Sequence, residues 1–225
     1  MKAIVFGLFV SLTFLAAPVA HALGNQTGMA PADPSTDQST NQSVVVADTD
    51  GFDELDPFDP NIEKTLEMMD WLYEFQTGES ANIDDGNPHL FSTCYRQTCP
   101  IWIRVDKTTQ TAYLYINGNH SYSWLVSTGT PGYGTPDFDT HPNGRIYDRY
   151  TSTKYPGGDW NGLGNMPYAV FIQGGFAIHG TGKGNWSKLG RRASHGCIRL
   201  HPDNGYIFNR LVRQYGIYRT WITVE

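Results

Sequence analysis

Charge and cysteine are both scarce in this sequence of 225 residues. Charged residues make up 17% of the chain and the formal net charge is -6, which argues against a charged coiled coil and against the basic footprint of a nucleic-acid-binding protein. Three cysteines are too few for a disulfide scaffold. Beyond the first 22 residues, no apolar run has the length that a membrane-spanning helix needs. The length fits one domain with additional segments.

Residues 1–22 have the pattern of a secretory signal peptide. Met1-Lys2 is a short positive start, Ala3 to Ala17 is almost wholly apolar, and Ala20-His21-Ala22 has the form of a cleavage site. The alternative is a membrane anchor, but the apolar run is shorter than the about 20 residues that span a bilayer. We therefore expect an exported protein of the periplasm or cell wall, with no stable membrane insertion after cleavage, in a compartment where disulfides persist.

Two further segments precede the main domain. Residues 23–51 contain no aromatic residue and are rich in small polar residues, which predicts a flexible leader. Residues 52–99 form an acidic segment in which Ile62, Leu66, Met69 and Tyr73 repeat at helical spacing. We expect an amphipathic helix over residues 61–76, which either packs on the main domain or binds a protein partner.

From residue 100 to residue 225 the pattern predicts a mainly β domain with flanking helices. Asn117-Gly118 is a strong hairpin turn, and a helix is expected from Asp203 to Tyr215, with Gly216 after its end. Short strands separated by Gly-rich turns are typical of a sandwich or barrel. The expected strands are residues 101–105, 112–116, 122–126, 169–173, 176–178 and 218–224, with a further candidate near 145–151.

A Gly- and Pro-rich stretch over residues 131–165 carries many aromatic side chains. Long irregular segments inside compact domains are often binding loops or lids. The alternative is a surface loop whose aromatic residues fold back onto the core, and the sequence does not decide between the two.

The cysteines divide into a pair and a single residue. Cys94 and Cys99 lie just before the first strand, and in an exported protein they can close a small disulfide at the domain entrance. A redox pair is the alternative, although such pairs are more often C-x-x-C. Cys197 is then left unpaired. It is either a small buried hydrophobe or a functional thiol.

The surroundings of Cys197 favour a functional thiol. Gly196 allows close backbone approach, so that amide groups here can face a developing oxyanion. His179 lies at the end of an apolar strand, where a rigid element can hold an imidazole. A thiol attacks as the thiolate, and a nearby imidazole can accept its proton. The pair therefore predicts nucleophilic catalysis, with Cys197 as the nucleophile and His179 as its base.

The segment between these two residues is basic. It carries Lys183, Lys188, Arg191 and Arg192 and no acidic residue, so it either favours the thiolate and attracts substrate carboxylates or is an ordinary solvated loop. A zinc site built from Cys197 with neighbouring histidines is a further alternative, but paired ligand spacings are absent. We expect no metal and no cofactor.

The two motifs resemble a known signature. His179-Gly180-Thr181, followed after fourteen residues by Ser194-His195-Gly196-Cys197-Ile198-Arg199-Leu200, is similar to the signature of the L,D-transpeptidase (YkuD-type) catalytic domain family. The similarity runs roughly from Pro100 to Val224. It differs at residues 137–143, which intervene before Gly144 in the expected substrate loop, so substrate preference stays open.

The resemblance implies a mainly β catalytic fold and a peptidoglycan stem-peptide substrate. It implies Cys197 as nucleophile and His179 as general base, with Ser194, His195, Gly196 and Arg199 supporting the site or its oxyanion hole. The implied reaction forms 3→3 cross-links through a cysteine thioester. Alternatives with the same two catalytic residues are an L,D-carboxypeptidase or endopeptidase and an enzyme that tethers or detaches lipoproteins. A non-catalytic cell-wall-binding protein is the alternative of another class.

Overall fold

The computed structural model describes residues 56–83, 94–150 and 158–225, all within one compact unit that spans residues 46–225. The predicted signal peptide, residues 1–22, and the predicted leader, residues 23–51, lie outside the described residues. None of the helices in the described ranges combines the length and the apolar character needed to cross a membrane.

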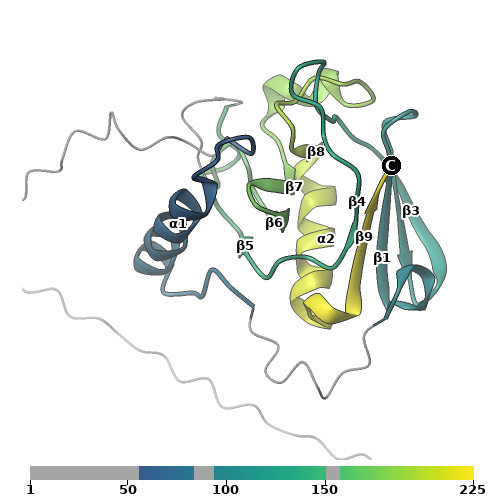
Figure 1. Cartoon of the computed structure of the whole chain (residues 1–225), viewed down its shortest axis with the longest axis horizontal. Coiled ribbons are helices and arrows are strands. Elements are labelled where there is room, and N and C mark those ends of the chain that lie inside the picture. The colour runs from purple at the N-terminus through teal and green to yellow at the C-terminus, as the bar shows by residue number, and fades with distance from the viewer. Residues whose placement is uncertain (1–55, 84–93, 151–157) are drawn as a thin grey trace, which may run out of the picture. The chain divides into compact units, whose positions relative to one another are not determined.

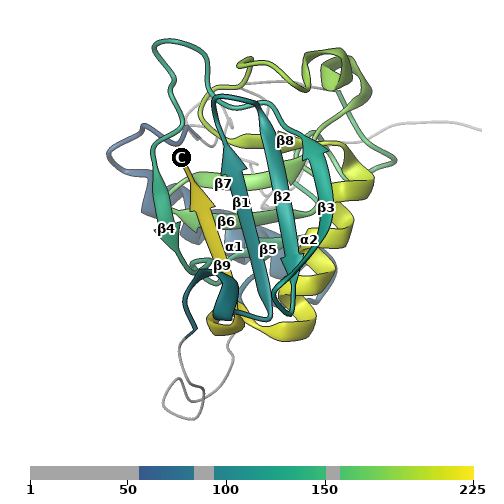
Figure 2. The ribbon, with the colours of Figure 1, turned by 90° about the vertical axis from the view of Figure 1, so that its right-hand side faces the viewer.

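Two β-sheets form the body of the domain (Figures 1 and 2). The first has the strand order β3-β2-β1-β9-β4, and the second has the order β5-β6-β7-β8. This confirms the mainly β fold with flanking helices. The strands are β1 (Ile101–Asp106), β2 (Thr111–Ile116), β3 (Asn119–Leu125), β4 (Phe138–Thr140), β5 (Ile146–Tyr147), β6 (Ala169–Gln173), β7 (Phe176–Gly180), β8 (Ile198–Leu200) and β9 (Thr220–Val224).

The first sheet begins as the predicted meander of β1, β2 and β3. Asn117 and Gly118 both have positive φ, the backbone conformation that a tight hairpin turn requires. The last strand, β9, pairs in parallel with β1 and places the end of the chain inside the sheet. Because β9 is buried between two partners, its Ile222 and Val224 contribute to the core.

One short strand differs from the expectation. Residues 137–143 were expected to belong to a substrate loop, but Phe138–Thr140 form β4 and pair with β9 at the sheet edge. Asp139 fixes this edge by accepting hydrogen bonds from Trp221 Nε1 at 2.7 Å and Thr223 Oγ1 at 2.9 Å. The expectation of a loop was wrong for residues 138–140 alone, because cross-strand partners 82 and more positions away determine the conformation there.

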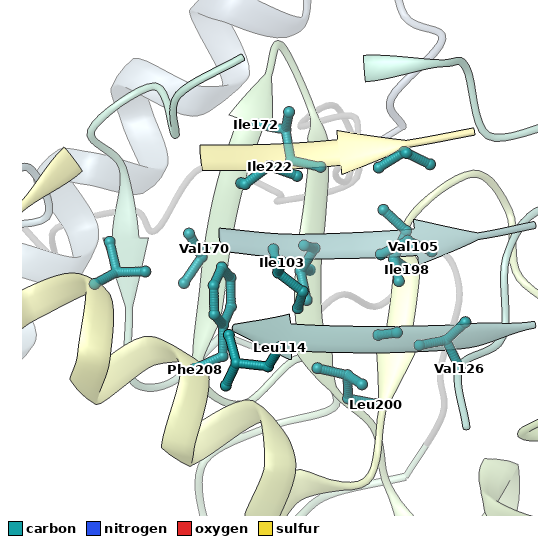
Figure 3. Packing of buried hydrophobic residues seen from close by; sticks show 14 of the residues in the cluster. Ile103, Val105, Leu114, Val126, Val170, Ile172, Ile198, Leu200, Phe208 and Ile222 are labelled. Carbon is teal, nitrogen blue, oxygen red and sulfur yellow. The ribbon is translucent and has the colours of Figure 1, made fainter. Parts of the chain in front are cut away.

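The main hydrophobic core lies between the two sheets (Figure 3). The first sheet contributes Ile103 and Leu114, and the second contributes Val170 and Ile198. Helix α2 (Pro202–Tyr215) adds Phe208, which is fully buried. Burial of a large apolar side chain contributes roughly 1.5–3 kcal/mol, so this shared core is the main force that holds the sheets together.

Helix α1 (Ile62–Thr77) covers a second cluster on the other face of the second sheet. Its buried residues Leu66 and Tyr73 belong to that cluster with Tyr147 and Phe171, and Gly78 ends the helix in the left-handed conformation. The helix was predicted over residues 61–76. Its packing against the sheet agrees with one of the two roles considered for it.

Candidate active site

Cys197 and His179 lie on the same face of the second sheet, away from the main core. Strands β7 and β8 are parallel, and Ile178 pairs with Ile198 while His179 pairs with Arg199. Side chains alternate between faces along a strand. Because Ile178 and Ile198 point into the main core, His179, Arg199 and Cys197 belong to the opposite face, where Cys197 joins the cluster under α1.

The His179 imidazole is fixed by its own strand. The ring is 3% exposed, and Nδ1 lies 2.6 Å from the carbonyl oxygen of Gly180. A carbonyl oxygen only accepts, so Nδ1 carries the proton and Nε2 is left as an acceptor. Burial is the main reason that the pKa of His179 is lowered to about 3; the hydrogen bond to Gly180 opposes this shift, and the positive Arg199 adds to it. The ring is therefore neutral near pH 7.

The Cys197 thiol is also buried and protonated. Burial raises its pKa to about 11, while the Arg199 guanidinium opposes that shift. Its Sγ donates to the Gly175 carbonyl at 3.5 Å. Within the described ranges, no hydrogen bond joins this sulfur to the His179 ring. The structure thus holds a neutral thiol and a neutral imidazole on one face, a resting arrangement rather than an ion pair.

Ser194 and Gly196 shape the turn that presents Cys197. Ser194 Oγ donates to the Cys197 carbonyl at 2.6 Å and accepts from the Gly196 amide at 3.2 Å. Gly196 has φ of 113°, a conformation that favours glycine. The Gly196 amide, which the sequence suggested as an oxyanion donor, is thus engaged inside the turn. The Ser194 hydroxyl therefore bridges the Gly196 amide and the Cys197 carbonyl and stabilises the turn.

Thr135 was not singled out by the sequence, yet it supports the same turn. Its buried hydroxyl donates to the Gly196 carbonyl at 2.6 Å and accepts from the Gly129 amide at 2.9 Å. A side chain at Gly129 would collide with the backbone of Tyr133, 1.8 Å from its carbonyl oxygen. The glycine therefore permits the tight loop that brings Thr135 to Gly196. In the sequence, the Gly-rich segment around Thr135 indicated a loop, but this pattern does not indicate that Thr135 contacts Gly196.

Arg199 and His195 occupy the surroundings of the thiol. Arg199 Nη1 donates to the Ala193 carbonyl at 2.9 Å, and its backbone pairs with Ser127. The His195 ring contacts Tyr133 edge to face, with centroids 5.1 Å apart. Burial lowers the pKa of His195, so this ring too favours the neutral form.

The basic segment before the motif is solvent-exposed. Lys183, Lys188, Arg191 and Arg192 all have exposed side chains, and the charge of Lys188 reaches His195. This arrangement can attract anionic groups toward the motif.

The aromatic stretch over residues 131–165 divides between core and surface. Phe138, Tyr147 and Tyr150 are buried, whereas Tyr133 is exposed beside His195. The residues at 151–157, with Tyr155, lie outside the described residues.

The remaining cysteines lie apart from Cys197 in the fold. Cys94 and Cys99 are joined by a disulfide just before β1, in the first sheet, whereas Cys197 precedes β8 in the second. Nowhere in the described ranges do three or more His, Cys, Asp or Glu residues gather as a metal site would require.

A β-sandwich with an unpaired cysteine and a tautomer-fixed histidine on one outer face has the parts of a thiol-dependent acyl-transfer enzyme. The sequence model of the YkuD family, the L,D-transpeptidase catalytic domain, matches residues 100–218, more than half of the chain. The chain belongs to this family, whose members act on peptidoglycan.

The solved structures that are similar to this chain include three L,D-transpeptidases. An L,D-transpeptidase from Mycobacterium smegmatis is 22% identical, with 56% of this chain and 59% of that chain covered and a TM-score of 0.44. L,D-transpeptidase 3 from Mycobacterium tuberculosis in complex with a faropenem-derived adduct is 19% identical, with 56% and 60% covered and a TM-score of 0.45. An L,D-transpeptidase from Stackebrandtia nassauensis is 22% identical, with 60% of each chain covered and a TM-score of 0.43. The chain thus spans about three fifths of the length of these proteins. A search of curated proteins gave no match.

Proposed function

We propose that this protein is an exported L,D-transpeptidase that forms 3→3 cross-links between peptidoglycan stem peptides through a thioester on Cys197. The Cys197 thiolate attacks the carbonyl carbon of the third stem residue, a diamino acid. The bond from that carbonyl to the terminal D-alanine breaks, and the D-alanine amine leaves with a proton. An amine of a second stem then attacks the thioester and restores the thiol. One amide replaces another, so the reaction needs no external energy source.

His179 is the proposed proton carrier in both half-reactions. The observation that carries the proposal is the 2.6 Å contact from Nδ1 to the Gly180 carbonyl, on the face shared with Cys197. This contact leaves Nε2 as the acceptor for the thiol proton. The resulting imidazolium then donates that proton to the departing amine.

The raised pKa of Cys197 and the lowered pKa of His179 make proton transfer unfavourable in the resting structure. Arg199 is the nearby cation proposed to stabilise the thiolate, because its positive charge lowers the pKa of Cys197 and so opposes the effect of burial. Access of the substrate and rotation of the thiol from Gly175 toward His179 are therefore part of the proposed cycle. Ser194, His195 and Gly196 are proposed to hold the turn in place while this occurs.

Intact-mass analysis with purified tetrapeptide muropeptides tests this proposal. Wild-type protein is expected to gain the mass of an acyl group and to yield cross-linked dimers. Cys197→Ala is expected to do neither, and His179→Gln is expected to slow acylation by about 100-fold or more, the usual contribution of a general base. His120→Gln is the matched control, because His120 is an exposed histidine in the β2–β3 hairpin and should leave the rate unchanged.

Product analysis separates the acceptors. Cross-linked dimers support transfer between stems, whereas tripeptides alone indicate that water is the acceptor and that the protein is a carboxypeptidase. Turnover that persists in Cys197→Ala would overturn the thioester mechanism itself.

A further inference from the structure

The segment just before α1 lies against the turn that carries Cys197. This segment, residues 56–61, is called the strap below. A Cβ atom at Gly175 would lie 2.9 Å from Pro57 Cα, and one at Gly196 would lie 3.1 Å from the Phe58 ring. Pro57 is buried. The strap is therefore in close contact with glycines of two different segments.

Those two glycines flank the sulfur. The Gly175 carbonyl accepts the hydrogen bond from Cys197 Sγ, and Gly196 is the residue immediately before Cys197. The Phe58 ring contacts Phe176 at a centroid distance of 5.3 Å and Tyr133 at 6.1 Å, both nearly edge to face. The strap thus covers the two backbone segments that flank the sulfur, with Pro57 buried and the Phe58 ring 45% exposed.

The strap also brings a negative charge to the site. Burial is the main reason that the pKa of Cys197 is raised, and the Asp56 carboxylate raises it further. Burial and Arg199 lower the pKa of His195, and the Asp56 charge opposes them, so this charge acts on both residues. A carboxylate beside a thiol disfavours the thiolate. Both the cover and the charge therefore act against nucleophilic attack.

Local hydrogen bonds give the strap a defined shape. Asp56 Oδ1 accepts from the Phe58 amide at 3.0 Å, and the Asp56 carbonyl accepts from the Asp59 amide at 3.0 Å. The Ile62 amide then donates to the Asp59 carbonyl at 3.2 Å and leads into α1. The strap is thus a folded turn joined to the helix, and the two are expected to move together.

We propose that the strap is an autoinhibitory element, which covers the Cys197 thiol at rest and must leave before a stem peptide reaches the sulfur. The inference rests on the proposed function, since it describes the regulation of that same site.

The attachment of α1 fits an element that can be displaced. Arg145 holds the helix through Asp70 Oδ2 and Glu63 Oε2, each at 2.9 Å. Between the helix and the domain lies a cavity of about 220 Å³, lined in part by Met69, Tyr73 and Tyr150. Atoms that line a void lose packing contacts on that side. The helix is therefore held by Leu66 and Tyr73 in the second cluster and by polar contacts such as those from Arg145, across an apolar interface that is incompletely filled.

Thiol alkylation tests the proposal without any peptidoglycan. The rate of modification of Cys197 by iodoacetamide is measured by intact mass on the full chain, before and after each substitution. Asp56→Asn keeps the side-chain oxygen that accepts from Phe58 but removes the charge. For each unit by which the thiol pKa falls, the rate is expected to rise about threefold, because the thiolate fraction rises about tenfold while its nucleophilicity declines.

Phe58→Ala removes part of the cover and is expected to increase the alkylation rate several-fold. Phe75→Ala is the matched control, because Phe75 is an exposed aromatic residue of α1 that stacks on Trp71 and not on the motif. Its alkylation rate should stay at the wild-type value. Thermal unfolding of each variant shows whether a faster alkylation rate comes from a general loss of structure. If Phe58→Ala is destabilised, the alkylation rate of Asp56→Asn, which keeps the packing, decides whether the strap protects the thiol.

The outcomes separate this inference from the proposed function. Wild-type alkylation rates in both strap variants, or slower acylation by muropeptides with Phe58→Ala, would overturn the autoinhibitory role. If the strap variants alkylate faster but neither they nor the wild type transfer a stem peptide, the strap is supported and the proposed function fails.

Discussion

Removal of the Thr135 hydroxyl is expected to loosen the turn that presents Cys197. This hydroxyl joins two buried backbone groups, the Gly129 amide at 2.9 Å and the Gly196 carbonyl at 2.6 Å. Thr135→Val keeps the shape of the side chain and leaves both groups without this partner. A buried group left unpaired costs about 1–3 kcal/mol, so two of them give about 2–4 kcal/mol after partial relaxation.

Urea unfolding measures this loss. With a slope of about 2 kcal/mol per M, the midpoint of Thr135→Val is expected to fall by about 1–2 M. Thr135→Ser retains the hydroxyl and should lose about 1 kcal/mol or less for the missing methyl group. Thr108→Val, at an exposed turn position, should stay within about 0.5 kcal/mol of wild type.

The same variants show whether Thr135 positions the turn that carries Cys197 or only stabilises the fold. If Thr135 positions the turn, Thr135→Val should slow acylation of Cys197 under conditions where the protein is fully folded, and Thr135→Ser should restore most of the rate. A Thr135→Val protein with wild-type stability and wild-type acylation would refute this reasoning, because it would mean that the two hydrogen bonds carry no free energy.

The buried His179 imidazole and the Asp139 carboxylate both predict a loss of stability in acid, over different pH ranges. The pKa of His179 is about 3 in the folded state and 6.5 in the unfolded state, so the unfolded state binds more protons between these two values. Stability therefore falls as the pH drops below 6.5, and the free energy of unfolding should decrease by about 2 kcal/mol from pH 7 to pH 5. His179→Gln should remove this dependence on pH. Burial raises the pKa of Asp139, but hydrogen bonds from Arg96, Trp221 and Thr223 lower it to about 2. The stabilisation that ionised Asp139 gives to the folded state is therefore present above pH 3.8 and is lost as the pH falls toward 2. Thermal unfolding of Asp139→Asn should show a loss of about 1 kcal/mol at pH 7, a figure discounted for solvent exposure, and little loss at pH 2.

Local sequence patterns were sufficient for the elements that alternate or repeat over several residues. Strand β6 was expected at residues 169–173 and is observed there, and α2 begins one residue before its expected start. In both, the side chains that face the core recur with the period of the element itself. The Asn117-Gly118 turn was also readable, because its positive φ angles demand residues that tolerate them.

Elements fixed by distant partners were not readable in this way. Strand β4 has three residues, and its pairing with β9 connects positions more than 80 residues apart. The contact of Thr135 with Gly196 spans 61 residues. Pro57 and Gly175 carry no local signal that they meet, since each alone is compatible with many loops. The sequence indicated the residues proposed to carry the chemistry, but it did not indicate which residues hold them in place or lie against them.

The Cys197 thiol must meet two opposed requirements: it must react as a nucleophile, and it must resist oxidation while no substrate is bound. In the proposed exported protein, a free thiol that accompanies a disulfide is exposed to exchange and oxidation, and both proceed through the thiolate. With its pKa raised to about 11, the thiolate fraction of Cys197 at pH 7 is on the order of one in ten thousand. The burial that protects the sulfur would also make it a slow nucleophile if it were permanent. A strap that supplies part of this burial and carries Asp56 separates the two requirements in time, because its departure removes the cover and the opposing charge in one motion while Arg199 and His179 stay on the sheet.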